Sequence, residues 1–514
     1  MGKNIGNLLL LIFCLLIYFL SIRGIAGNPK AEELNSLKWR NNGPFEQTGR
    51  FALLYSIVED HSFKFSLPLA RFATPDLAMI DGNYVSLFAP GVSFIAIPGY
   101  LIGKYFGFAQ VGTFAVISIF AICNIFLIRA IAVKLSIPSV TATIGGLIFA
   151  FASPAFPYAV DLYQHHISTF LILFSIYSLL YFTDFTALIL VWLLFGISIF
   201  VDYPNFLMML PIGIYALTRV FTVKRNIKAI RFEFDLLKVF TLIVIIFPLI
   251  FLLWFNQMSY GDPFRLSGTT SRITKIDVNG KPVDVKVNKN ISKSPENIVS
   301  KQVSIFNMFD TRLMLNGFYI HFISQDRGIF MYTPVMIFGF IGGVIYLKKK
   351  KKFAMLFSYI ILINILVYSM WGDPWGGWSF GSRYLIPAYA ILSIFIAYLL
   401  LLLRARNLFL IVFFAVLSYS VAINTLGAVT SSLNPPRVEA DILSREAKQE
   451  VKYTYERNMD FISNQGSKSF FFNIYGSHRI SAWNYYIYLT FFIIIVFGFL
   501  ILYNSVVTDR RKFL

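Results

Sequence analysis

The sequence predicts an all-α integral membrane protein, a bundle of about twelve transmembrane helices with a long first external loop that carries juxtamembrane helices. Hydrophobic residues make up 57% and aromatic residues 18% of the 514 residues, and the mean hydropathy is +0.66. A soluble domain contains a much smaller fraction of apolar residues. Apolar runs long enough to cross a bilayer recur along the chain, near 4–22, 109–134, 139–157, 164–183, 184–202, 203–220, 235–256, 328–347, 353–370, 384–403, 407–429 and 482–504.

The formal net charge of +19 has a membrane explanation. In a soluble chain it would suggest a nucleic acid partner. Here we expect no nucleic acid, because lysine and arginine concentrate where helices end in the cytoplasm. Cys14 and Cys123 both lie inside apolar runs, so neither a disulfide framework nor a cysteine zinc site is expected.

The first apolar run has two interpretations. It follows Lys3 and precedes "GIAG", as a signal peptide would, but it is longer than a usual signal sequence. We therefore expect a retained first span. In either case residue 24 onward lies outside the cytoplasm.

The stretch 84–107 is apolar but is interrupted by Pro90 and Pro98. If it crossed the membrane, the later basic connections would lie outside; if it does not cross, they all lie in the cytoplasm with both termini. We therefore expect an interfacial or partly re-entrant helix on the outer leaflet, with a kinked crossing helix as the alternative. The basic connections are 129–135, 218–231, 348–352, 404–406 and 509–514.

This topology predicts how the chain is divided, and an "NG" turn predicts a β-hairpin at 275–287. The expected parts are an N-terminal transmembrane module (1–256, including the external loop 24–108), an external loop or small subdomain (257–327), a C-terminal transmembrane module (328–429), an external loop (430–481), and a last helix with a cytoplasmic tail (482–514).

Unusual polar residues gather on the external side, whereas the middles of the spans are almost free of ionisable residues. An ion-coupled transporter usually needs charges or broken helices near the midplane. Polar chemistry just outside the hydrocarbon suits a reaction whose substrate is partly lipid. Arg327 and Arg383 begin spans at this surface, where arginine binds lipid phosphate well, although both side chains could simply snorkel from helix ends.

Several motifs occur in a characteristic order along most of the chain. They are "FEQTGRFALLYSIVEDHSF", "DGNYVSLFAPGVSFIAIPGYLIG", "SPAFPYAVDLYQHH", "YGDPFRLSG", "RGIFMYTPV" and "WGGWSFGSRYLIP". In this order they resemble the GT-C superfamily of membrane glycosyltransferases, particularly bacterial and archaeal relatives of protein O-mannosyltransferases and lipid A aminoarabinose transferases. The resemblance implies transfer of a sugar from a polyprenyl or dolichyl phosphate outside the cytoplasm, and amphipathic helices in the first external loop.

The resemblance also implies roles for individual residues. The family's essential acid falls on Glu46, but relatives commonly have an Asp-Glu pair where this chain has "FEQ", so Asp76 and Asp81 compete as catalytic carboxylates. The family's lysine in a Lys-Pro-Pro region is missing from "FAPG" at 88–91. Arg383, Arg327 or Arg50 would then bind the donor phosphate.

The expected substrate-binding residues are His165, His166, Tyr84, Asp202 and Trp378. Most have a structural alternative: Asp202 can cap a span, and Trp378 belongs to an interfacial aromatic belt in any case. A metal site usually needs three donors, and adjacent histidines on a helix point apart. No metal ligand is assigned and no cofactor is required, although the superfamily sometimes uses a divalent metal.

The predicted function is therefore a plasma-membrane glycosyltransferase that acts on the extracytoplasmic side. One carboxylate would serve as general base in an inverting single displacement, because the lipid phosphate leaves already anionic. The acceptor would be a lipid, a cell-envelope glycan or a protein. The alternatives are a multi-pass transporter or lipid flippase and a non-catalytic scaffold; the scaffold predicts that the candidate residues do not converge.

Overall fold

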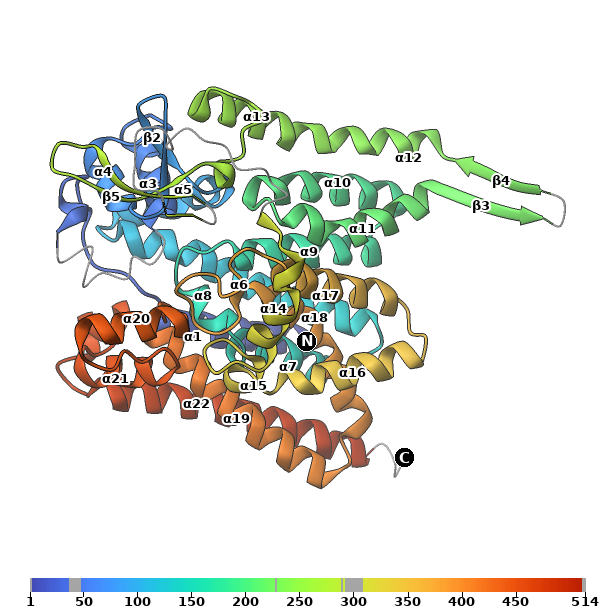
Figure 1. Ribbon diagram of the computed structural model, residues 1–514. Helices are drawn as coiled ribbons and strands as arrows, with labels where there is room; N and C mark the ends of the chain where they lie inside the picture. Colours follow the sequence, from blue (N-terminus) through green and yellow to red (C-terminus); the bar gives the residue numbers. More distant parts are fainter. Residues whose placement is uncertain (1, 37–47, 227–228, 288–289, 292–307, 511–514) are drawn as a thin grey trace.

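The computed structural model describes residues 2–510 except 37–47, 227–228, 288–289 and 292–307. Every apolar run expected to cross the membrane forms a helix or consecutive helices (Figure 1). These are α1 (Gly2–Ser21), α6 (Ala109–Lys134), α7 (Ser139–Phe151), α9 (His165–Tyr181), α10 (Asp184–Val201), α11 (Asn205–Val220), α12 (Leu236–Phe240) with α13 (Ile246–Tyr260), α16 (Met336–Lys348), α17 (Ala354–Ser369), α18 (Ile386–Leu403), α19 (Asn407–Val429) and α22 (Ala482–Arg510).

The helices form the bundle of an integral membrane protein. In the described part of the chain, six helical segments are long and apolar enough to cross a membrane, and most of the other spans are shorter apolar helices. Helix α18 lies in the centre, buried from Ile386 to Leu400, and packs against α7 and α16. The segment α12–α13 lies at the edge and exposes an apolar face suited to lipid, including Leu237, Phe247 and Trp254.

The two ends of the bundle differ. One end, which we call the loop-rich end, carries α3 (Thr48–Val58), α4 (Leu67–Ala73), α5 (Gly91–Tyr105), α20 (Arg437–Ala447) and α21 (Glu456–Asn464) (Figure 1). The opposite end carries the hairpin of β3 (Phe221–Asn226) and β4 (Ala229–Phe234) and the lysine-rich connection 348–352. The expected external segments and these two basic connections thus lie at opposite ends. The remaining short helices are α8 (Ala155–Ala159), α14 (Met314–Phe322) and α15 (Ile329–Tyr332).

An antiparallel sheet at the loop-rich end joins the expected segments 24–108 and 257–327. Its order is β2-β1-β5-β6-β7, formed by β1 (Leu77–Ile80), β2 (Asn83–Ser86), β5 (Arg272–Ile276), β6 (Pro282–Val287) and β7 (Asn290–Ile291). Strand β1 meets β5 where Leu77 pairs with Ile273. The hairpin predicted at 275–287 is confirmed as β5–β6, with Gly280 at φ +81° in its turn.

The stretch 84–107 starts as a strand, and its helix, α5, begins only at Gly91. Gly99 and Gly103 of α5 lie against Gly112 of α6, where a Cβ on Gly112 would lie 2.7 Å from the Cα of Gly103. This close contact accounts for the glycines.

Candidate active site

Arg383 lies at the loop-rich end in a cage of three tyrosines. It begins the turn that leads into α18, and its guanidinium carbon lies 5.2 Å from the ring centre of Tyr163, 5.6 Å from that of Tyr384 and 6.0 Å from that of Tyr158. Its Nη2 donates a hydrogen bond to the carbonyl of Gly376 at 2.7 Å. Its buried Nε has no hydrogen-bond partner among the described residues. The cage therefore holds a planar cation whose Nε–H is available to donate a hydrogen bond.

Arg50, from α3, brings a second guanidinium group to the same place. The residue is 4% exposed, and its guanidinium carbon lies 4.1 Å from the ring centre of Phe88. It interacts electrostatically with Asp202, Arg383 and Asp76. Burial lowers the pKa of Arg50 to about 10, and the two carboxylates oppose this shift. Arg50 and Arg383 thus come together from the first external loop and the start of α18.

Asp202 is the carboxylate that both arginines face. It follows the last residue of α10, and its Oδ2 accepts a hydrogen bond from Nε2 of Gln164 at 3.3 Å. Burial raises the pKa of the Asp202 carboxyl, while Arg50, the hydrogen bond from Gln164 and Arg383 oppose that rise. The neighbouring cations offset the free-energy cost of burying this carboxylate. The carboxylate is therefore paired within the site rather than isolated there.

Asp76 borders this cluster, whereas Asp81 forms a turn. Asp76 forms an ion pair with Arg272 at 3.0 Å, and a Cβ on Gly49, next to Arg50, would lie 2.6 Å from the Asp76 carbonyl oxygen. Asp81 is exposed, at φ +49° in the turn between β1 and β2, which is the conformational role that its "DGN" context predicts. Glu46 lies outside the described residues, two positions before α3 begins.

Among the described residues, cations and carboxylates meet here in equal number. Arg50, Arg383 and Arg272 face the carboxylates of Asp202 and Asp76, and Asp373 interacts electrostatically with Arg383. The guanidinium groups of Arg50 and Arg383 are the groups suited to an anionic ligand, and the Nε of Arg383 supplies a donor for it.

The two adjacent histidines have different surroundings. The His165 ring stacks with Tyr163 at 6.0 Å and lies 5.5 Å from the Tyr158 ring, so it forms part of the cage wall, and its buried Nε2 has no hydrogen-bond partner among the described residues. The His166 ring is within hydrogen-bond distance of the Ala155 carbonyl, 2.7 Å from Nε2. His165 therefore remains a candidate for substrate contact, and the surroundings of His166 point to a structural role.

Arg327 is committed to the main chain. The residue is 1% exposed. Its guanidinium group donates to four carbonyls, those of Trp375 (3.2 Å), Asp326 (2.7 Å), Gly377 (3.1 Å) and Asn434 (2.8 Å). These bonds hold the 375–377 turn against the 434 region, and they leave Arg327 little capacity to bind a phosphate.

Tyr84 and Trp378 also have structural partners. The Tyr84 hydroxyl donates to the Gly280 carbonyl at 2.7 Å and so binds β2 to the β5–β6 turn. The Trp378 indole N–H donates to Glu439 at 2.6 Å. Trp378 faces a separate shallow hollow of about 470 Å³, which is also lined by Leu443, Glu446, Ala447, Val451 and Arg457.

The sequence motifs contained the tyrosine cage without identifying it. Tyr158 and Tyr163 lie in "PYAVDLYQHH", but tyrosines are common in an aromatic-rich chain, and their convergence on Arg383 follows only from the tertiary position of the turn 158–164. As for a metal, the described residues bring no three histidine, cysteine, aspartate or glutamate side chains together.

Comparison with known proteins finds similarity in structure alone. No protein-family model and no curated protein matches the chain. ArnT from Cupriavidus metallidurans bound to undecaprenyl phosphate matches over 97% of this chain and 77% of its own, at 12% identity and a TM-score of 0.46. The archaeal oligosaccharyltransferase AglB from Archaeoglobus fulgidus, in complex with an inhibitory peptide and a dolichol-phosphate, matches over 88% and 60%, at 12% identity and a TM-score of 0.49.

Proposed function

We propose that the protein is a membrane glycosyltransferase that transfers a sugar from a polyprenyl-phosphate or dolichyl-phosphate donor to an acceptor outside the cytoplasm. The observation that supports this most is the convergence of two guanidinium groups, those of Arg50 and Arg383, beside Asp202 at the loop-rich end of a lipid-embedded bundle. A scaffold has no need for such a cluster. The order of sequence motifs and the expected topology favour the same function.

In this proposal, Arg383 and Arg50 bind the lipid phosphate. Guanidinium groups pair with phosphate through charge-assisted, often bidentate hydrogen bonds. The same charges stabilise the negative charge that develops on the phosphate as its bond to the anomeric carbon breaks. The aromatic cage keeps the Arg383 side chain in place before the donor arrives, so little conformational entropy is lost on binding.

The chemical step needs one general base. A carboxylate removes the proton from the acceptor hydroxyl as its oxygen attacks the anomeric carbon, and the lipid phosphate departs with the bonding electron pair. A single displacement inverts the anomeric centre. Glu46 is the first candidate for the base, since it precedes the helix that carries Arg50. Asp76 is the second, and its carboxylate forms an ion pair with Arg272.

The test is transfer by purified protein. Wild type is incubated with radiolabelled polyprenyl-phosphate sugars and membrane extract, beside Arg383→Ala, Glu46→Gln and the control Glu33→Gln, an exposed glutamate of the same loop. Sugar transfer by wild type and the control, and its loss in the other two variants, is the expected result. Movement of lipid across vesicles without transfer of any sugar would instead favour the transporter or flippase hypothesis.

A further inference from the structure

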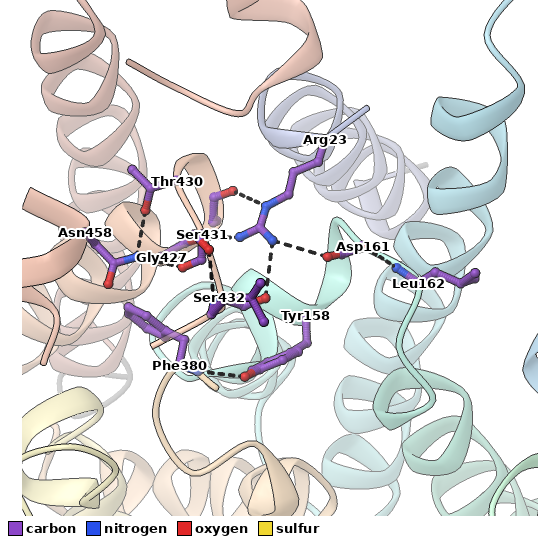
Figure 2. A network of polar contacts seen from close by, with 12 residues as sticks. Arg23, Tyr158, Asp161, Leu162, Phe380, Gly427, Thr430, Ser431, Ser432 and Asn458 are labelled. Atoms are coloured by element: carbon purple, nitrogen blue, oxygen red, sulfur yellow. Dashed lines mark hydrogen bonds and ion pairs between the residues drawn. The ribbon is translucent and has the colours of Figure 1, made fainter. Parts of the chain in front are cut away.

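Arg23, at the loop-rich end, is completely buried and lies apart from the cluster of Arg50, Arg383 and Asp202. Arg23 follows the end of α1, and both it and its ion-pair partner Asp161 are 0% exposed. The Arg23 guanidinium group binds Asp161 Oδ2 at 3.4 Å and the Ser432 hydroxyl at 3.3 Å (Figure 2). It also donates to the carbonyls of Gly427 at 2.7 Å and Ala428 at 3.3 Å.

One side chain therefore connects three segments that are far apart in the sequence: the exit of α1, the turn 158–164 and the region 427–432 (Figure 2). The main chain strengthens the connection, since the Arg23 N–H donates to the Val160 carbonyl at 3.3 Å. Asp161 in turn accepts a hydrogen bond from the Leu162 N–H at 2.7 Å, which fixes the turn beside it.

Two of these segments contact the loop that leads to Arg383, since a Cβ on Gly427 would lie 2.6 Å from the Phe380 ring. The turn 158–164 carries Tyr158 and Tyr163 of the cage, and the Tyr158 hydroxyl accepts a hydrogen bond from the Phe380 N–H at 2.8 Å (Figure 2). The carbonyl of Asn434, shortly after the third segment, accepts a hydrogen bond from the Ser379 N–H at 2.9 Å. The turn 158–164 and the chain around 427–434, which Arg23 connects, are thus both hydrogen-bonded to the loop that carries Arg383.

We infer that Arg23, through Asp161, is a positioning residue that sets the tyrosine cage and with it the orientation of the Arg383 guanidinium group for the lipid phosphate. This inference rests on the proposed function. It explains why an ion pair is kept at a buried position, where apolar residues of similar volume often give equal stability.

The fork geometry of arginine makes the inference testable. Arg23→Lys keeps the charge, but a single ammonium cannot reach the carboxylate, the hydroxyl and two carbonyls together. We expect its affinity for undecaprenyl phosphate to fall about tenfold, within the range measured for residues coupled through one network. Affinity is measured from the rise in unfolding temperature with increasing lipid phosphate.

A double-mutant cycle separates positioning from general destabilisation. In an Arg383→Ala background, Arg23→Lys should cause no further loss of affinity, because its effect acts through Arg383. The control is Arg219→Lys, the same change at another ion pair. Arg219 lies at the C-terminal end of α11 and pairs with Asp184 at 3.2 Å. The control should bind as wild type does.

Each outcome decides between the hypotheses. Equal losses from Arg23→Lys in both backgrounds, or no loss in the Arg383-containing protein, overturn the positioning role and leave the proposed function intact. Unchanged binding in Arg383→Ala alone overturns the phosphate role itself, and the inference with it. If Arg23→Lys does not fold, Ser432→Ala removes one acceptor of the network, and wild-type affinity in that variant overturns the inference.

Discussion

Replacement of Arg383 by lysine tests the phosphate-binding role directly. Lysine keeps the positive charge within the tyrosine cage but has a compact ammonium group in place of the planar fork. In the wild type, one N–H donates to the Gly376 carbonyl, and Nε has no hydrogen-bond partner among the described residues. The single ammonium group of lysine cannot donate at the same time to that carbonyl and to a phosphate oxygen that lies in a different direction.

The expected magnitude follows from this geometry. A hydrogen bond to a charged group contributes about 1.5–3 kcal/mol. Arg383→Lys should lose roughly one such bond at the low end of this range, so donor affinity should fall about tenfold. Arg383→Ala loses the charge and the hydrogen bonds that the guanidinium group would donate to the phosphate. Two such bonds contribute about 3 kcal/mol or more to binding, so the donor affinity should fall at least about a hundredfold.

The assay titrates detergent-solubilised protein with undecaprenyl phosphate and follows the unfolding temperature. The midpoint without ligand serves as an internal control, since it reports any loss of folding from the substitution. Donor affinity in Arg383→Ala equal to that of wild type, with a normal midpoint, refutes the reasoning. An equal loss for lysine and alanine shows that the fork, rather than charge, accounts for binding.

Three further outcomes are expected. Glu46→Gln should reduce sugar transfer about 10²–10⁴-fold while donor binding survives, and near wild-type transfer with collapse in Asp76→Asn would move the base to Asp76. Gly112→Ala should lower stability by about 1–3 kcal/mol, because its Cβ meets the backbone of α5, whereas Gly6→Ala, with open space around it, should not; equal unfolding temperatures contradict this packing. A cysteine at Tyr105, which is 83% exposed, should react with an impermeant thiol reagent from outside the cell in a cysteine-free background, and reaction only from the cytoplasmic side contradicts the topology.

The sequence determined the helices and the ends at which their connections lie. Apolar runs in a bilayer must form helices, since every backbone N–H needs a partner there, so the segments 109–134 and 407–429 match α6 and α19 residue for residue. The "NG" turn was equally local, and the β5–β6 hairpin followed from it. The strand at Asn83–Ser86 was missed although its partner β1 is adjacent across the Asp81-Gly82 turn, because the apolar stretch 84–107 was interpreted as one helix.

Only part of the candidate site could be predicted from the sequence. Arg50, Asp202, His165 and Arg383 were named from their motifs, but so was Arg327, whose sequence context at a span start is similar. Local sequence sets which side chains exist near the membrane surface. Only the tertiary structure decided that the Arg327 donors meet four carbonyls while those of Arg383 meet tyrosine rings and one carbonyl. A guanidinium group's partners come from segments distant in sequence, and their positions depend on how the whole bundle packs.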